Sequence, residues 1–275
     1  MRLATAASPA QLPTGPPMFL LDKWYLDVVT DEGAAAIFYA ARLRWGLLRQ
    51  GYASALYVAP GAAPREQATR RHFEWPHEDQ DTITWHNEPL RVLAHWRRDA
   101  APIARSLVDD PPDALHWTCH MPRARASAQV GDTMLEGLGY VESLRLRVPP
   151  WKLPLRTLRW GRHASSGHSV VWIEWSGADQ RRWVWLDGAL QPAATLVEAG
   201  LSGLEGESAL QLEPFRNLRD SPLLATIGGP LPSLARRLAG PLGRMHERKH
   251  LSRSAIVSSG RQLDRGWTVH EEVTW

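Results

Sequence analysis

Cysteine is nearly absent from this chain, which has one, Cys119, in 275 residues. A single cysteine cannot close an intrachain disulfide, so the fold does not depend on an oxidising compartment. Long apolar runs are lacking as well. No stretch approaches the roughly 20 apolar residues of a membrane-spanning helix, and residues 1–17 contain no apolar run typical of a signal peptide. We therefore expect a cytoplasmic protein.

Neither sign of charge dominates, because 32 Lys and Arg residues face 29 Asp and Glu residues, a formal net charge of +3. The basic residues occur as scattered pairs, for example Arg70-Arg71 and Arg236-Arg237, and form no stripe that would bind a nucleic acid. Glycine motifs that bind phosphates or dinucleotides are missing too. The sequence predicts no nucleic-acid partner, no cofactor and no obligatory protein partner.

Tryptophan, in contrast, is abundant: 14 tryptophans accompany 5 tyrosines and 4 phenylalanines. A single ring of this size most often fills a core. A concentration of them also suits the wall of a pocket for a large apolar or π-rich ligand. Both interpretations remain open at the level of sequence.

The apolar pattern is that of β-strands. The turn Asp31-Glu32-Gly33 lies between two aromatic and β-branched runs, which is a hairpin signal. The proline-rich link Val148–Leu155 cannot lie in a central strand and divides the chain. We expect a mainly β protein with an irregular leader at 1–22 and two consecutive antiparallel β-barrel or sandwich units at 23–148 and 149–275. One short helical segment is predicted near the C-terminus, at Pro232–Arg248.

The clearest predicted hairpin joins residues 169–175 to residues 182–187 and places acids among tryptophans. Period-two alternation puts Val170, Trp172 and Glu174 on one face of the first strand. The same alternation puts Trp183, Trp185 and Asp187 on one face of the second strand.

The pentapeptide His246-Glu247-Arg248-Lys249-His250 matches the pattern in which two histidines one helical turn apart hold zinc and the glutamate acts as general base. Charged neighbours such as Arg244 and Arg253 are unlike the apolar surroundings of such a site. A zinc hydrolase that uses His246, Glu247 and His250 is therefore a remote alternative, and the main prediction includes no metal.

The segment Gly137-Leu138-Gly139-Tyr140-Val141-Glu142 combines glycines with a tyrosine and an acid. Glycines in a strand permit a bulge or a close backbone approach, and Tyr140 and Glu142 would then point to the same face. The plain alternative is a bulged strand with a glutamate at the surface.

At these residues the chain resembles the lipocalin-like superfamily that contains carotenoid 1,2-hydratase (hydroxyneurosporene synthase) and the AttH-like proteins and, more distantly, tocopherol cyclases and fungal Diels–Alderases. The resemblance rests on Gly137–Glu142, on Trp151–Leu155 with Leu158–Arg162, on Val170–Trp175 and on the closing Gly266–Glu271. The hydratase motif has an aspartate where this chain has Glu142. The resemblance implies two consecutive lipocalin-like units and cofactor-free chemistry on an isoprenoid, polyene or polyketide.

Such chemistry begins when an acid protonates an alkene, and burial in an apolar pocket keeps a carboxyl group neutral. We expect Glu142 to donate the proton and Tyr140 to orient it or a water molecule. Tryptophan faces would stabilise the resulting cation. The expected substrate-binding residues are Trp160, Trp172, Glu174, Trp175, Trp183, Trp185 and Asp187.

The predicted reaction is hydration, cyclisation or isomerisation of a hydrophobic unsaturated substrate. A non-catalytic binder or carrier of a lipid or pigment would use the same pocket without a neutral acid. A third hypothesis is a pericyclic catalyst, which mainly holds a polyene in a reactive shape. A hydrophobic small molecule is the expected partner in each case, and a peripheral contact with a membrane is one route by which it could reach the protein.

Overall fold

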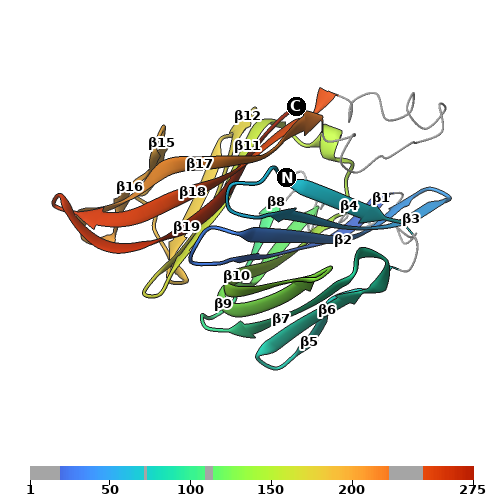
Figure 1. Cartoon of the computed structure of the whole chain (residues 1–275). Helices are drawn as coiled ribbons and strands as arrows, with labels where there is room; N and C mark the ends of the chain where they lie inside the picture. Colours follow the sequence, from blue (N-terminus) through green and yellow to red (C-terminus); the bar gives the residue numbers. More distant parts are fainter. Residues whose placement is uncertain (1–18, 71–72, 109–113, 223–243) are drawn as a thin grey trace, which may run out of the picture.

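The computed structural model describes residues 19–70, 73–108, 114–222 and 244–275. Within these ranges the chain forms two antiparallel sheets, of ten and nine strands. The strand order of the first sheet is β4-β3-β2-β1-β10-β9-β7-β6-β5, and β8 pairs with β9 outside this order. The order of the second sheet is β14-β13-β12-β11-β19-β18-β17-β16-β15. In Figure 1 the second sheet lies at the upper left and the first sheet at the lower right.

The strands of the first sheet are β1 (Phe19–Val29), β2 (Ala35–Trp45), β3 (Leu48–Val58), β4 (Arg65–Thr69), β5 (His77–Asp79), β6 (Thr82–Asn87), β7 (Val92–Arg98), β8 (Ile103–Val108), β9 (Leu115–Val130) and β10 (Thr133–Leu146). Those of the second sheet are β11 (Leu155–Ser165), β12 (Ser169–Gly177), β13 (Arg181–Leu186), β14 (Ala189–Leu190), β15 (Thr195–Val197), β16 (Gly200–Leu204), β17 (Ser208–Pro222), β18 (His246–Ser258) and β19 (Arg261–Thr274). Three single 3-10 turns accompany them in the described residues: η1 (Glu88–Leu90), η2 (Pro150–Lys152) and η3 (Glu205–Glu207).

The predicted mainly β, two-unit antiparallel fold is confirmed. The change from one sheet to the other falls between Leu146 and Leu155, in the proline-rich link. Of the leader expected at 1–22, residues 1–18 lie outside the described residues, and residues 19–22 already belong to β1. None of the helical segments in the described ranges has the length and apolarity needed to cross a membrane.

The helical segment expected at 232–248 falls mostly on residues 223–243, which lie outside the described ranges. Where the prediction can be compared, it is wrong, because His246, Glu247 and Arg248 belong to strand β18. These residues pair with β17 on one side and β19 on the other. The two ladders satisfy the backbone hydrogen bonds that a helix would otherwise have formed internally.

Two of the three apolar clusters lie inside the individual sheets. Phe38 in β2 contacts Trp85 in β6 and Trp96 in β7, with ring centroids 5.6 and 5.9 Å apart. Several strands separate β2 from β6 and β7 in the sheet order, so the first sheet must curl around this cluster. A smaller cluster around Trp172 lies on one face of the second sheet.

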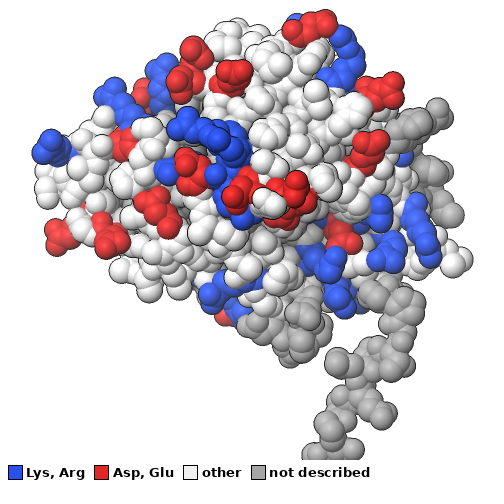
Figure 2. Space-filling view, turned by 90° about the horizontal axis from the view of Figure 1, so that it is seen from below, with Lys and Arg blue, Asp and Glu red and all other residues white. Residues whose placement is uncertain are grey.

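The third apolar cluster joins the two sheets and contains the proposed site residues Tyr140, Trp160, Trp175, Trp183 and Trp185. The outer surface is different. Figure 2 shows basic and acidic side chains interspersed on one face of the molecule. A face with mixed charges creates no large field of one sign.

Candidate active site between the two sheets

The glycines of β10 bring this strand unusually close to β1. A Cβ atom on Gly137 would lie 2.1 Å from the carbonyl oxygen of Val29, and one on Gly139 would lie 2.5 Å from that of Asp27. Directly after Gly139 the register of β10 with β9 shifts, as it does at a bulge. The predicted close approach and bulge are therefore confirmed, and both Tyr140 and Glu142 face the second sheet.

The Glu142 carboxyl group collects three hydrogen bonds on one oxygen. Its Oε2 accepts from Trp117 Nε1 at 2.6 Å, from the Tyr140 hydroxyl at 2.7 Å and from Trp160 Nε1 at 3.1 Å. Trp117 lies in β9 and Trp160 in β11, so both sheets contribute donors. We call Glu142, Trp117, Tyr140 and Trp160 the acid cage. The alternative of a surface glutamate is wrong, because Glu142 is 8% exposed.

Burial raises the pKa of Glu142, whereas the hydrogen bond from Trp117, the charge of Lys23 and the bonds from Tyr140 and Trp160 act against this rise. The net direction is upward, which favours the neutral acid. Oε1 receives no hydrogen bond within the described ranges. Because Oε2 already accepts three, the proton of the neutral acid belongs on Oε1.

Four other acids between the sheets differ from Glu142 because each has a cationic partner. The pairs are Asp27 with Arg162, Glu66 with Arg219, Glu247 with Arg219 and Lys249, and Glu271 with Lys249. Glu142 forms no ion pair within the part of the chain that the structure describes. A buried carboxyl group without an ion-pair partner favours the neutral acid, and here the charge of Lys23 opposes this only in part, because the net shift of the pKa of Glu142 is upward.

Asp27 and Arg162 form a completely buried ion pair beside the acid cage. Arg162 donates to the two carboxylate oxygens of Asp27 at 2.5 and 2.9 Å, and both side chains have 0% exposure. Burial raises the pKa of Asp27, and the charge and hydrogen bonds of Arg162 oppose this. Tyr25, whose hydroxyl donates to Asp27 at 2.9 Å, is the register partner of Glu142. The pair therefore ties β1 to β11 next to the acid.

Lys249 in β18 also lies close to the acid cage. Its ammonium group contacts the carboxylates of Glu247 and Glu271 and lies 5.8 Å from the ring centroid of Trp160. Burial lowers the pKa of Lys249 to about 8, against the raising effect of Glu247. Burial alone would raise the pKa of Glu247, but the charges of Lys249 and Arg219 lower it to about 2. Both groups are therefore charged at neutral pH.

Four of the five predicted tryptophans lie on the face between the sheets. Trp160 belongs to the acid cage, Trp185 stacks on Trp117 with centroids 5.2 Å apart, and Trp175 meets Trp183 at 4.9 Å. All of them are less than 9% exposed. In the described part of the chain these rings fill a packed core, so their expected role as the wall of an open pocket remains a proposal.

Trp172 and Glu174 lie on the opposite face of the second sheet. The register pairs Trp172 with Val184 and Ile173 with Trp183, so Trp172 does not share a face with Trp183 and Trp185. It lies across Gly161, where an added Cβ would meet its ring at 2.1 Å. Glu174 approaches Arg159 and Arg182 at 4.0 and 3.9 Å. Neither residue reaches the acid cage.

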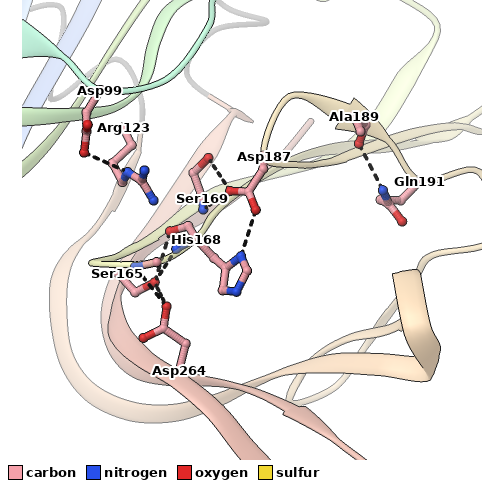
Figure 3. A network of polar contacts seen from close by, with 10 residues as sticks. Asp99, Arg123, Ser165, His168, Ser169, Asp187, Ala189, Gln191 and Asp264 are labelled. Carbon is pink, nitrogen blue, oxygen red and sulfur yellow. Dashed lines mark hydrogen bonds and ion pairs between the residues drawn. The ribbon is translucent and has the colours of Figure 1, made fainter.

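Asp187 is a turn residue and not a strand residue, with a φ of 50° directly after β13. Figure 3 shows it between His168 and Ser169, whose Nδ1 and backbone N–H lie 2.7 Å from its two carboxylate oxygens. Its side chain is 44% exposed. Asp187 therefore fastens the β11–β12 turn to the end of β13, away from Glu142.

The alternative of a zinc site at His246, Glu247 and His250 is wrong. They lie on a strand, where residues four apart are separated by roughly 13 Å, so the two histidines cannot share one ion. Glu247 points to the opposite face, where it pairs with Arg219 and Lys249. No group of three or more potential metal ligands occurs within the described ranges.

A large hollow of about 1390 Å³ opens between the sheets beyond the acid cage. Its lining includes Val29, Leu138, Arg162 and Trp267. Val29 follows Asp27 by two residues on β1, and Leu138 precedes Tyr140 by two on β10, so the hollow begins beside the Asp27–Arg162 pair and Tyr140. None of the four cage residues lines it. Its lining is more polar than the apolar pocket that we expected from the sequence.

Several residues of the site were not identified from the sequence. Asp27 and Trp117 have no motif around them, and Lys249 appears in the sequence only as a member of the candidate zinc motif from His246 to His250. A charged residue such as Asp27 or Lys249 is mostly found at the surface, so neither was expected in the interior. Arg162 was noticeable only as a neighbour of Trp160. The one available signal was an acid within an otherwise apolar run, at Asp27.

His163, beside Arg162 on β11, is a buried histidine whose burial should make the stability of the protein depend on pH. It is completely buried, its Nδ1 lies 2.8 Å from Ser254 Oγ, and its Nε2 has no partner in the described residues. Burial, with the nearby charge of Arg162, lowers the pKa of His163 from 6.5 to about 3. Below about pH 6.5, His163 is therefore protonated in the unfolded chain but stays neutral in the folded chain. The free energy of unfolding decreases as the pH falls from there towards 3.

We expect His163 to account for about 3 kcal/mol of the stability lost between about pH 7 and about pH 4.5. Urea unfolding of the wild type and of His163→Asn at both values measures this, because the variant should lose correspondingly less. His86, which is exposed in β6, is the control: His86→Asn should keep the wild-type pH dependence. Equal pH dependence in all three proteins would contradict a buried neutral His163.

Comparison with models of known protein families finds no match, and no curated protein matches the chain in sequence. Solved structures do match. CghA superposes with a TM-score of 0.61 at 12% identity, over 93% of this chain and 88% of CghA. The AttH-like protein NE1406 from Nitrosomonas europaea gives 0.55 at 13% identity, over 98% of this chain and 99% of its own. Kievitone hydratase from Nectria haematococca gives 0.55 at 8% identity, over 92% and 88%.

These likenesses extend over nearly the whole length of both partners in each comparison. At identities this low they establish the fold alone. The resemblance to the lipocalin-like superfamily of AttH proteins and hydratases is thereby confirmed as a resemblance of fold.

Proposed function

We propose that this protein is a cofactor-free enzyme that acts on a hydrophobic, unsaturated small molecule of the isoprenoid, polyene or polyketide class. The reaction is an acid-catalysed hydration, cyclisation or isomerisation, and Glu142 is the proton donor. The observation that carries the proposal is a buried carboxyl group with no ion-pair partner in the described residues, held through one oxygen by three donors among aromatic rings.

The chemistry follows from the two oxygens of Glu142. The π electrons of an alkene take the proton from Oε1, and the electron pair of the broken O–H bond stays on the carboxylate. The three donors on Oε2 bind this carboxylate more strongly than they bind the neutral acid. They therefore stabilise the charge that develops in the transition state, which is how preorganised donors accelerate a reaction.

The carbocation formed in this step needs an electron-rich wall. The faces of Trp117 and Trp160 are the best side-chain partners for a cation, at about 0.5–2 kcal/mol each. In a hydration, water then adds through its oxygen and returns a proton to Glu142. In a cyclisation, a second double bond attacks the cation, and loss of a proton to Glu142 completes the cycle. Both routes restore the neutral acid.

Substrate would reach the acid cage from the large hollow between the sheets. Val29 and Leu138 line the hollow and stand two residues from Asp27 and Tyr140 on the same strands. Because the cage rings are tightly packed, an occupied site requires Trp160 or its neighbours to change rotamer. The fold neighbours agree with a site of this kind: one is a hydratase by name, and CghA has also been solved with Sch210972.

The first test is organic extraction of natively purified protein followed by liquid chromatography and mass spectrometry. We expect a stoichiometric polyene, isoprenoid or polyketide. Incubation of that compound with the protein in ¹⁸O-labelled water then distinguishes the reactions, because only hydration places the label in the product. An extracted ligand that the protein leaves unchanged would favour the carrier. Absence of any ligand, together with no turnover of an isoprenoid and polyene panel, would contradict the proposed function.

A further inference from the structure

The hairpin between β2 and β3 presents apolar side chains to solvent at its tip. Leu47 is fully exposed, at 102%, and Leu48 is 48% exposed. Trp45 pairs with Leu48 across a turn of two residues, in which Gly46 takes a positive φ of 56°. A short turn of this kind holds the side chains of Leu47 and Leu48 in solvent. Figure 1 shows the hairpin extending at the right-hand edge, beyond the rest of the first sheet.

Two arginines stand directly behind the exposed leucines. Arg44 on β2 is the register partner of Arg49 on β3, and both are exposed. Like charges directly opposite each other destabilise a hairpin. Within the described ranges neither guanidinium has an acidic partner. An external anion would remove the repulsion and turn this pair into a favourable feature.

Aromatic rings accompany these side chains at the same end of the hairpin, and Trp45 stands one position nearer the tip than Arg44. Trp45 is 5.3 Å from Trp151 between ring centroids, and Phe19 lies 6.5 Å from Trp45 and 6.1 Å from Trp151. Trp45 and Trp151 are half-buried, and the neighbouring Lys152 is exposed. Aliphatic, aromatic and cationic side chains therefore gather within the last two residue pairs of the hairpin, Trp45 with Leu48 and Arg44 with Arg49. Membrane-interface anchors contain these elements, because leucine enters the acyl boundary, arginine binds lipid phosphates and tryptophan sits at headgroup depth.

We propose that the tip of the β2–β3 hairpin, residues 45–49, inserts into the interface of a membrane that contains anionic lipids. The aliphatic tip supplies apolar area that leaves water on insertion, and the opposed arginines supply the charge that selects an anionic surface. The contact is peripheral and reversible. It does not depend on Glu142, so it holds whether the protein is an enzyme or a carrier.

The proposal is tested by flotation of the full chain with phosphatidylcholine vesicles that contain or lack phosphatidylserine. We expect binding to the anionic vesicles at low salt that weakens at high salt. The variants Leu47→Asp and Arg44→Glu should each lower the partition coefficient by about tenfold or more. Leu263→Asp is the control, because Leu263, at 53% against 102% for Leu47, is also an exposed leucine near the turn of another hairpin, and it should bind as the wild type does.

A second measurement locates the inserted residue. Cys119 is completely buried, so Leu47→Cys and, as control, Leu263→Cys can each be labelled selectively with an environment-sensitive dye. The dye at position 47 should shift to the blue on anionic vesicles and be quenched by brominated lipids, and the dye at position 263 should not change. Absence of binding to anionic vesicles, or equal binding by Leu47→Asp and the wild type, would overturn the proposal. So would a tip that docks on protein and leaves the dye unchanged on lipid.

Discussion

Replacement of Asp27 by asparagine should lower the free energy of unfolding by about 3–5 kcal/mol. The change leaves the guanidinium of Arg162 completely buried without its carboxylate, at a point where β1 and β11 hold the two sheets together. An uncompensated charge in such a place costs far more than the pair contributes. Urea unfolding at neutral pH, followed by circular dichroism, measures the loss.

Two further proteins make this test specific. Asp99→Asn breaks an ion pair with Arg123 whose acid is 40% exposed, and it should cost less than about 1 kcal/mol. The double variant Asp27→Leu with Arg162→Met removes both charges and should be more stable than Asp27→Asn alone. If Asp27→Asn costs no more than Asp99→Asn, the buried pair does not connect the sheets as described.

Replacement of Glu142 by glutamine should lower turnover of the extracted substrate by about 10²–10⁴-fold, the usual contribution of a general acid. Glutamine has the same shape as the neutral acid and can still accept from Trp117 and Tyr140, but it has no proton to give. We therefore expect nearly unchanged ligand affinity together with the loss of turnover. Glu142→Asp retains an acid on a shorter chain and should retain part of the activity.

The matched control is Glu174→Gln. Glu174 is also a strand glutamate in a tryptophan-rich hairpin, but it faces away from the acid cage and approaches Arg159 and Arg182. Its replacement should leave turnover unchanged. Full activity in Glu142→Gln would remove Glu142 from its role as proton donor. Equal loss in both variants would point to a general disturbance of the fold.

Some properties of the site residues follow from the local sequence, and others depend on how the strands pair. The predicted bulge and shared face of Tyr140 and Glu142 are local properties of β10, because two glycines and period-two alternation determine them. The face of Trp172 is a property of register, and the alternation within β12 could not tell which of its two faces meets the first sheet. The spacing of His246 and His250 predicts a helix, whereas pairing with β17 and β19 makes this segment a strand.

By itself, then, the sequence determined the β class, the change of sheet at the proline-rich link and the local geometry that makes Glu142 a candidate acid. Only the tertiary structure decided that Glu142 is surrounded by donors. Trp117 and Trp160 are 25 and 18 residues away along the chain, and the Asp27–Arg162 pair spans 135 residues. Alternation and turn chemistry act over a few residues, and they contain no information about which strand of one sheet faces which strand of the other. That choice is made by the packing of the two sheets as a whole, and the acidity of Glu142 depends on it.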